Sequence, residues 1–297
     1  MLAFVLVSIC LVSAASAAMS AKKAEYFVDV AWLAANLDKV VVLDARSDKH
    51  YAVSHIPGAI HSTWTNWTDR SKGKQGDKGW NVTMEKSKLE AYVGSLGIDG
   101  SKPIVVYGDP SGLAEDGRVM WELRLVGVNA VKLLDGGFPA WKAAGKPVTA
   151  DAPKIRPAKF AFSAIHEEYR VLFDEIRTNP KKCVILDTRS RDEYIGKINH
   201  GEKRNGHIPG AVFMAFNELY HDDGTVMDVD EIQKHLESKG VKKDQCIITY
   251  CTIGIRSGFT ALRLRMAGYD ARNYEASYSE WAGDASLPIE ASPPGDQ

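Results

Sequence analysis

The sequence predicts an α/β fold made of two similar domains, each a mainly parallel β-sheet flanked by helices. Short runs of β-branched and apolar residues, such as residues 40–44 and 247–250, alternate with segments of helical periodicity, such as residues 28–37. The pattern of the first half of the chain also returns in the second half. The 297 residues, 45% of them hydrophobic and 25% charged, are sufficient for two domains of about 130 residues each.

The internal repeat is visible in three motifs. Val-Val-Leu-Asp-Ala-Arg-Ser at residues 41–47 returns 143 positions later as Val-Ile-Leu-Asp-Thr-Arg-Ser at residues 184–190. His-Ile-Pro-Gly-Ala at residues 55–59 returns at residues 207–211. At the original spacing, Ile-Val-Val-Tyr-Gly at residues 104–108 aligns with Ile-Ile-Thr-Tyr-Cys at residues 247–251. The first copy therefore has Gly108 where the second has Cys251, and only the second copy carries a thiol at this place.

Cys251 lies where a predicted strand gives way to a predicted helix over residues 258–267, with Ser257 as its N-cap. A loop that contains Gly254 at such a junction can turn its backbone N–H groups toward one point and attract an anion. Together with Arg256, this arrangement favours the thiolate, which is the nucleophilic form of cysteine. The alternative is a structural cysteine, because free cysteines are often buried. We interpret Cys251 as a reactive nucleophile.

Several ordered motifs resemble the tandem-domain rhodanese sulfurtransferases, which include thiosulfate and 3-mercaptopyruvate sulfurtransferases. These motifs are Tyr-x-x-x-His-Ile-Pro-Gly-Ala at residues 51–59, the six-residue loop 251–256, and Tyr-Glu-Ala-Ser-Tyr-Ser-Glu-Trp at residues 274–281, which pairs with residues 134–141 of the first copy. The last motif departs from the family at Ala276 and Tyr278, where glycine and tryptophan are usual. The resemblance covers the whole mature chain and implies that the first of two rhodanese-like domains is inactive.

We expect an inactive rhodanese-like domain over residues 24–148, a linker over residues 149–159 and a catalytic rhodanese-like domain over residues 160–290. Residues 1–18 are expected to be a signal peptide, because the first 17 residues lack charged side chains and end in Ala-Ser-Ala. The mature protein would then be exported, to the periplasm or outside the cell, and would not be bound to a membrane. The alternative is that Met19 is the true start, which would leave the protein cytoplasmic or mitochondrial.

The mature chain keeps three cysteines, Cys183, Cys246 and Cys251. An odd count argues against a framework of disulfides. Cys246 and Cys251 lie five positions apart on one extended strand, at roughly 3.3 Å per residue, which is too far to bridge. Cys183 and Cys246 are therefore expected to begin buried strands and to be inert.

The resemblance implies that Cys251 attacks the sulfane sulfur of a donor and carries it as a persulfide in a ping-pong cycle. It places the donor and the persulfide against the loop residues Thr252, Ile253, Gly254, Ile255 and Ser257. Arg256 is predicted to bind the charged end of the donor, with an internal salt bridge as the alternative.

A basic insertion near residues 196–206 makes the second copy nine residues longer than the first between its aspartate and histidine motifs. The family usually has an arginine six residues after the strand-end aspartate, and this chain has Glu193 there. We predict that Arg204 in the insertion takes over the contact with the donor, with Arg191 as the alternative.

Several polar residues of the second copy recur in the first copy. Because the first copy has no cysteine nucleophile, this recurrence favours a structural role for them. They are expected to fix the carboxyl edge of each sheet through buried hydrogen bonds, and the two tryptophans of the last motif are expected to be core or interdomain anchors. The residues are Asp44, Arg46, His55 and Trp141 in the first copy and Asp187, Arg189, His207 and Trp281 in the second.

The predicted function is a monomeric sulfurtransferase that moves sulfur from thiosulfate to cyanide or a thiol, without metal or cofactor. The basic insertion and Arg256 favour the thiosulfate dianion, although the loop Cys-Thr-Ile-Gly-Ile-Arg matches neither the thiosulfate nor the mercaptopyruvate pattern of the family. Mercaptopyruvate as donor and a non-enzymatic persulfide carrier stay open as alternatives. A cysteine-dependent phosphatase is disfavoured, because such loops place five residues between cysteine and arginine and this one places four. The net charge of −1 gives no sign of a nucleic-acid partner.

Overall fold

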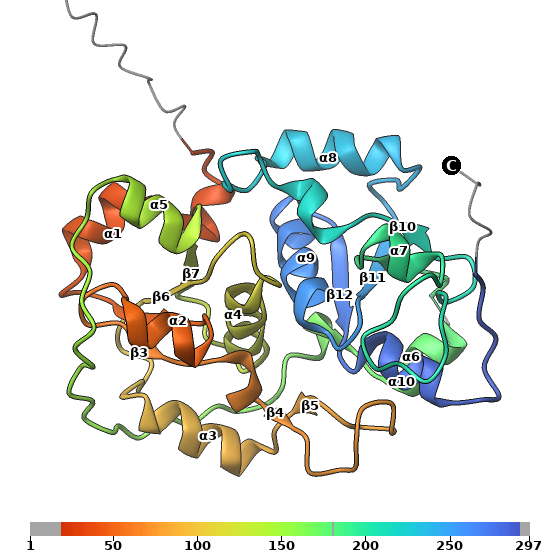
Figure 1. Ribbon diagram of the computed structural model, residues 1–297, viewed down its shortest axis with the longest axis horizontal. Coiled ribbons are helices and arrows are strands. Elements are labelled where there is room, and N and C mark those ends of the chain that lie inside the picture. Colours follow the sequence, from red (N-terminus) through yellow and green to blue (C-terminus); the bar gives the residue numbers. More distant parts are fainter. Residues whose placement is uncertain (1–18, 180, 292–297) are drawn as a thin grey trace, which may run out of the picture.

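Two five-stranded sheets, one in each half of the chain, form the framework of the protein (Figure 1). The computed structural model describes residues 19–179 and 181–291. In the first sheet the strands lie in the order β1 (Phe27–Val28), β7 (Val131–Leu134), β6 (Ile104–Tyr107), β2 (Val41–Asp44) and β3 (Ile60–His61). In the second sheet the order is β8 (Arg170–Val171), β12 (Asp270–Tyr274), β11 (Cys246–Tyr250), β9 (Val184–Asp187) and β10 (Val212–Phe213).

Neighbouring strands within each of these sheets are parallel, and the two sheets have the same topology. The predicted α/β class and the internal repeat are therefore confirmed. The register is also repeated, because Asp44 pairs with Tyr107 in the first sheet and Asp187 pairs with Tyr250 in the second. These pairs lie at the carboxyl edge of each sheet, where parallel α/β folds place their sites.

The helices connect the strands and cover the sheets (Figure 1). In the first half they are α1 (Val30–Asn36), α2 (Asp48–Val53), α3 (Lys86–Ser95), α4 (Glu115–Leu125) and α5 (Gly137–Ala143). In the second half they are α6 (Phe173–Thr178), α7 (Arg191–Tyr194), α8 (Val229–Ser238), α9 (Ile255–Met266) and α10 (Ser277–Gly283). Short 3-10 turns are η1 (Lys23–Glu25), η2 (Trp64–Asn66), η3 (Glu167–Tyr169) and η4 (Phe216–Leu219). No helix in residues 19–179 and 181–291 has the length and apolar character needed to cross a membrane.

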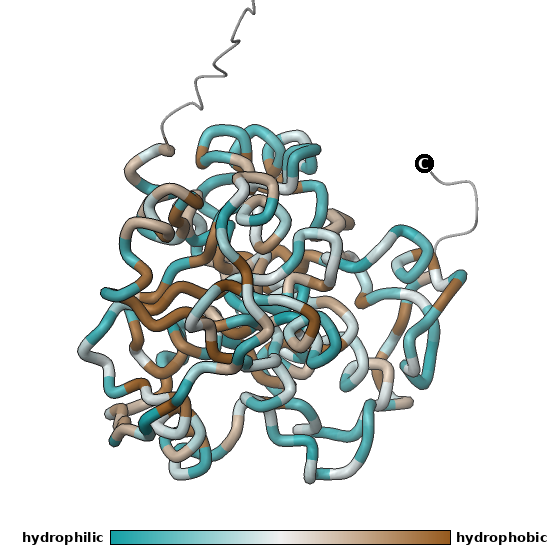
Figure 2. Tube along the Cα trace, turned by 60° about the vertical axis from the view of Figure 1, so that its left-hand side comes forward, coloured by the Kyte–Doolittle hydropathy of each residue, from teal (hydrophilic) through white to brown (hydrophobic). Residues whose placement is uncertain are grey.

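The hydrophobic segments lie along the strands in the interior, and hydrophilic segments run along the outer loops (Figure 2). One core cluster joins the two halves of the chain, because α4 and α9 lie side by side between the sheets (Figure 1). At the crossing, a Cβ added to Gly117 would lie 2.2 Å from the Cβ of Phe259. Only glycine allows this close approach. Helix α9, which begins in the Cys251 loop, therefore packs directly on α4, which follows the equivalent loop of the first domain.

A long segment of the first domain lies between η2 and β5 (Val82–Thr83). It contains β4 (Thr68–Asp69), which pairs with β5 in an antiparallel ribbon, and then extends toward α6 and α10 of the second half (Figure 1). Lys78 pairs with Asp174 of α6 at 3.2 Å, and the N–H of Gly79 donates to Glu280 of α10 at 2.6 Å. This segment of the first domain is therefore part of the contact with the second.

The expected signal peptide over residues 1–18 lies outside the described residues. The structure therefore leaves the signal peptide and the choice between Met1 and Met19 as predictions.

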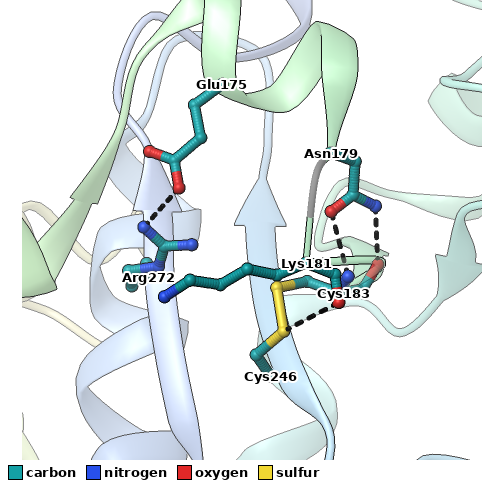
Figure 3. The surroundings of a disulfide bond; sticks show 6 residues. All are labelled: Glu175, Asn179, Lys181, Cys183, Cys246 and Arg272. Carbon is teal, nitrogen blue, oxygen red and sulfur yellow. Dashed lines mark hydrogen bonds and ion pairs between the residues drawn. A yellow bond between two sulfur atoms is a disulfide. The ribbon is translucent and has the colours of Figure 1, made fainter.

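Cys183 and Cys246 form a disulfide, and the prediction that both are inert, unpaired cysteines is wrong (Figure 3). Cys183 directly precedes β9, and Cys246 begins β11. In the parallel register Val184 faces Ile247, so the two cysteines are lateral neighbours with Cα atoms 4.7 Å apart. That distance lies in the range that a disulfide spans. Cys251 is the one cysteine left free among the described residues.

Loss of this disulfide is expected to lower the free energy of unfolding by about 4 kcal/mol, because the bond closes a long loop in the unfolded chain. The two cysteines are 63 residues apart in the sequence. The measurement is urea unfolding of the oxidised protein, of the same protein in dithiothreitol, and of a Cys183→Ala/Cys246→Ala variant. Equal midpoints for the oxidised and reduced protein would contradict the expectation.

Candidate active site

The candidate nucleophile lies at the junction of β11 and α9, as the sequence predicts. Cys251 follows the last residue of β11, is 1% exposed and carries a free thiol. The helix begins earlier than expected, at Ile255, with Gly254 as its N-cap in the left-handed region at φ 86°. A Cβ at Gly254 would lie 2.2 Å from the carbonyl oxygen of Glu275, so this position requires glycine. The prediction that Ser257 caps the helix is therefore wrong, and Ser257 lies in its first turn.

The loop supplies hydrogen-bond donors to the sulfur atom. The backbone N–H of Gly254 donates to Sγ of Cys251 at 3.1 Å. Burial raises the pKa of the thiol, but the positive charge of Arg256 and hydrogen bonds from Ser257 outweigh it, so that the pKa of Cys251 lies below its ordinary value. The thiolate is therefore favoured at the start of α9, where the helix dipole adds to the same effect.

The N-terminus of α10 holds the loop from the other side. Its first residue, Ser277, accepts a hydrogen bond from the N–H of Cys251 at 3.1 Å. The N–H groups of Tyr278 and Ser279 donate to the carbonyl oxygens of Cys251 and Thr252 at 2.9 and 3.0 Å. The C-terminal motif that contains these residues thus fixes the backbone on either side of the nucleophile.

Arg256 forms a buried, bidentate ion pair with Glu193 of α7, with both N–O distances at 2.8 Å. Thr252 joins the pair, since its hydroxyl donates to Glu193 and accepts from Arg256 at 2.8 and 2.7 Å. Burial raises the pKa of Glu193, but the bonds from Arg256 more than offset this, and the carboxyl pKa lies well below its ordinary value. The internal salt bridge, which was the alternative reading of Arg256, is therefore the arrangement found. The charge of Arg256 is largely compensated before any donor binds.

Arg204 does not line the cavity at Cys251, and the prediction that it replaces the family arginine there is wrong. Its guanidinium donates to four backbone carbonyls at the end of α10, those of Trp281, Ala282, Asp284 and Leu287, at 2.5 to 3.2 Å. A guanidinium with so many carbonyl partners is held in place as a structural clamp. Arg204 fastens the insertion to the segment that follows α10.

A cavity of about 230 Å³ opens above Cys251 and is lined from both domains. The loop contributes Cys251, Thr252, Ile253, Ile255 and Arg256, the insertion contributes His200, and the first domain contributes Gln75 and Leu113. Gln75 donates to the carbonyl of His200 and to the hydroxyl of Ser279, both at 3.0 Å. Gly254 and Ser257, which were also predicted to contact the donor, are not among the residues that line it.

The lining residues His200, Gln75 and Leu113 were not predicted individually. The insertion was predicted to contact the donor through Arg204, and the residue of the insertion that lines the cavity is His200. Gln75 and Leu113 carry no motif. Their place depends on how the first domain packs against the second, which no local pattern encodes.

Two stretches of the chain, residues 29–144 and 172–284, match the family described as the rhodanese-like domain. The chain belongs to the rhodanese family. The matched stretches contain the two parallel sheets apart from the short edge strands β1 and β8, and the second stretch contains the Cys251 loop.

Relatives of this rhodanese cover nearly its full length. A sulfur carrier protein of Thermus thermophilus, TtuD, is 29% identical over 284 residues, which are 89% of this chain and 96% of that protein. A putative thiosulfate sulfurtransferase of Haloferax volcanii is 28% identical and covers 90% and 96%. The mitochondrial thiosulfate/3-mercaptopyruvate sulfurtransferase 1 of Arabidopsis thaliana is 28% identical over 308 residues and covers 92% and 80%.

Solved structures show the same fold. The anaerobic ergothioneine biosynthesis enzyme of Chlorobium limicola superposes with a TM-score of 0.80 at 20% identity, over 92% of this chain and 71% of the other. YnjE superposes with a TM-score of 0.80 at 23% identity, over 91% and 69%. At these identities the likeness concerns the fold alone.

The polar residues shared by the two rhodanese domains have structural roles, as predicted. Asp187 accepts hydrogen bonds from Arg189 at 2.7 Å and from the hydroxyl of Tyr250 at 2.6 Å, and the ring of His207 bonds the carbonyl of Tyr194 at 2.8 Å. The first domain repeats these contacts through Asp44, Arg46, Tyr107, His55 and Tyr51. Trp141 and Trp281 are buried in the core of their own domains, and each indole N–H donates to a proline carbonyl. Contacts that recur in a domain without a nucleophile support the carboxyl edge of the sheet.

The first rhodanese domain has a carboxyl group against the position of the missing thiol. A Cβ at Gly108 would lie 2.8 Å from the carboxyl carbon of Asp116, in the first turn of α4. Burial raises the pKa of Asp116 to about 7. A carboxyl group at this place repels an anion when it is ionised and fills space when it is not. In the first domain a carboxyl group therefore occupies the space that a side chain at position 108 would need.

Proposed function

We propose that this protein is a sulfurtransferase that moves a sulfane sulfur from thiosulfate to cyanide or a thiol through a persulfide on Cys251. The observation that carries the proposal is a free thiol, 1% exposed, that accepts a hydrogen bond from the loop N–H of Gly254 and has a lowered pKa. The family to which the chain belongs and the sulfurtransferase names of its relatives support the same activity.

In the first half-reaction the Cys251 thiolate attacks the outer sulfur of thiosulfate. A bond forms between Sγ and that sulfur, the sulfur–sulfur bond of thiosulfate breaks, and sulfite leaves with the electron pair. In the second half-reaction cyanide attacks the outer sulfur of the persulfide, a carbon–sulfur bond forms, and thiocyanate leaves while the thiolate is restored. Neither step requires a proton, so no separate general base is needed. Backbone N–H groups that point at the sulfur stabilise the negative charge of both thiolate and persulfide.

The size of the site suits a small donor. The cavity above Cys251 is about 230 Å³, and Leu113, Ile253 and Ile255 make part of its wall apolar. His200 at the mouth is 59% exposed in its side chain and lies 4.0 Å from Glu193. The basic insertion gives less support to thiosulfate than the sequence suggested, because Arg204 is bound to carbonyls and Lys203 is paired with Asp77 at 3.2 Å.

3-Mercaptopyruvate is the second candidate donor, and the Arg256–Glu193 pair is the observation that favours it. Because Glu193 already compensates the charge of Arg256, the site has a weaker preference for a dianion such as thiosulfate over a monoanion such as 3-mercaptopyruvate. With this donor the thiolate attacks the thiol sulfur, the carbon–sulfur bond breaks, and the electron pair on carbon takes up the thiol proton to give pyruvate. The Arabidopsis relative is named for both donors.

The test of the proposal is steady-state sulfur transfer to cyanide with thiosulfate and with 3-mercaptopyruvate in parallel. Thiocyanate formed with a higher kcat/KM from thiosulfate would support the proposed donor. A higher kcat/KM from 3-mercaptopyruvate would transfer the assignment to the second candidate. Formation of a Cys251 persulfide without turnover to small acceptors would instead indicate a carrier, which is the role named for the Thermus relative.

We also propose that the protein is exported. The Cys183–Cys246 disulfide supports export, because such bonds persist in oxidising compartments. N-terminal sequencing of the protein isolated from its own host tests the proposal. A mature N-terminus near residue 18 on protein recovered outside the cytoplasm would support export through a cleaved signal. The same N-terminus on cytoplasmic protein, which a start at Met19 would give, or retention of the first residues would contradict it.

A further inference from the structure

Two side chains of the first domain bind the backbone of the active loop in the second. Asn81, next to β5, donates from Nδ2 to the carbonyl oxygen of Ile253 at 2.9 Å. Arg118, in α4, donates from Nη1 to the carbonyl oxygen of Gly254 at 3.0 Å. We infer that Asn81 and Arg118 are positioning residues. Through them the first domain sets the orientation of the peptide groups in the Cys251 loop. The inference rests on the proposed function, since it concerns the same thiol.

The Asn81 contact acts on the peptide group that touches the nucleophile. In a trans peptide the C=O and the next N–H point in opposite directions. The C=O of Ile253 points to Asn81, and the N–H of the same peptide, that of Gly254, points to Sγ of Cys251 at 3.1 Å. If this peptide turned over, a carbonyl oxygen would face the sulfur in place of a donor. Asn81 therefore stabilises the one orientation that favours a thiolate or a persulfide anion.

The Arg118 contact acts on the following peptide group. The C=O of Gly254 accepts from Arg118, from Nδ2 of Asn273 at 3.2 Å and from the N–H of Gly258 at 3.3 Å. The N–H of Ile255 belongs to this peptide and points the opposite way, away from Arg118. Arg118 is itself held by Glu122, one turn along α4, at 2.8 Å, and its side chain is fully buried. Its reach into the second domain is thus fixed by the packing of α4 against α9.

Contacts within the first domain also hold the Asn81 side chain in place. Asn81 has a φ of 64°, a left-handed conformation that asparagine tolerates better than most residues. Its Oδ1 accepts from the hydroxyl of Thr68 at 3.0 Å, which leaves Nδ2 free to bind Ile253. The residue is 0% exposed, so water does not compete for this amide. A buried side chain with both polar atoms engaged holds its partner in one orientation.

The experiment compares Asn81→Gly with Thr68→Val as a matched control. Glycine accepts the left-handed backbone at position 81 and removes the side-chain amide. Both variants lose the bond between Thr68 and Asn81, and only Asn81→Gly loses the bond to Ile253. The readout is the pH dependence of iodoacetamide alkylation of Cys251, followed on the peptide that contains it by mass spectrometry. Circular dichroism and thermal unfolding of each variant establish that it is folded.

We expect Asn81→Gly to raise the apparent pKa of Cys251 and to lower its alkylation rate about tenfold at a pH below that pKa, because a shift of one pKa unit changes the thiolate fraction tenfold. Thr68→Val is expected to stay within about twofold of the wild type, because it keeps the Asn81–Ile253 bond. Arg118→Lys provides a second test with the same expected direction, because lysine lacks the planar fork that binds Glu122 and Gly254 together.

Alkylation profiles of folded Asn81→Gly and Arg118→Lys that coincide with the profile of Thr68→Val would overturn the inference. The readout uses no sulfur donor, so it remains decisive if the protein has no sulfurtransferase activity. A wild type that transfers no sulfur, with alkylation profiles that differ between the variants as expected, would instead count against the proposed function alone.

Discussion

Replacement of Cys251 by serine is expected to reduce sulfur transfer from either donor by roughly 10³-fold or more, because the hydroxyl is a far weaker nucleophile and cannot carry a persulfide. Cys251 is the free thiol of the described residues and lies at the base of the cavity between the domains. The measurement is thiocyanate formation at saturating donor and cyanide. Serine is close to isosteric with cysteine at this buried position, so the thermal midpoint should change little.

The matched control is Cys183→Ala/Cys246→Ala, which removes two sulfur atoms from the same domain and keeps Cys251. Its kcat should remain close to that of the wild type below its unfolding temperature, because the disulfide lies at the opposite end of β11 from the nucleophile. Sulfur transfer that survives Cys251→Ser, or that disappears in the folded double variant, would contradict the assignment of the nucleophile.

Arg256→Gln is expected to destabilise the protein by roughly 3–5 kcal/mol, because it leaves the Glu193 carboxylate buried without its partner. The wild-type pair has two N–O distances of 2.8 Å, and the Glu193 side chain is only 1% exposed. The variant should also raise the pKa of Cys251, because the Arg256 charge lowers it in the wild type. Urea unfolding measures the first effect, and the pH profile of alkylation measures the second.

The pH dependence of this loss has a defined sign. The pKa of Glu193 is held well below its ordinary value in the folded protein, so the pair contributes its full stability above the unfolded pKa of about 4.3. That contribution decreases as the pH falls below this value. The stability difference between wild type and Arg256→Gln should therefore be larger at pH 7 than at pH 4.

Glu193→Gln and the double variant complete a cycle. The double variant should be more stable than Arg256→Gln alone, because it leaves no unpaired carboxylate. Additive effects of the two single substitutions, or an equal loss for Arg256→Gln at both pH values, would contradict a coupled buried pair.

The parts of the fold that could be predicted are those that local patterns determine. The apolar runs that contain Leu43 and Ile248 gave buried strands, and the repeat around Asp44 and Asp187 gave two sheets of one topology. Cys251 could be placed because a strand end, a glycine and a helix start follow one another in the sequence. These features depend on residues a few positions apart, where periodicity and backbone preference are informative.

The parts that could not be predicted depend on which distant side chains meet. Arg204 and Arg256 were interpreted from their charge, and both are bound to partners within the protein. The replacement of the family arginine by Glu193 was itself a signal, because a carboxylate in place of a cation favours a salt bridge to the remaining arginine of the loop. The disulfide could have been proposed by extending the aligned strands by one residue, which brings Cys183 beside Cys246.

A persulfide on Cys251 is tested most directly by mass spectrometry of the protein after incubation with thiosulfate and removal of the excess. We predict an added mass of one sulfur atom on the peptide that contains Cys251, absent from Cys251→Ser, and its loss as thiocyanate when cyanide is added. An unmodified Cys251 peptide after incubation with thiosulfate and with 3-mercaptopyruvate, or added sulfur on another residue, would contradict a persulfide mechanism at this site.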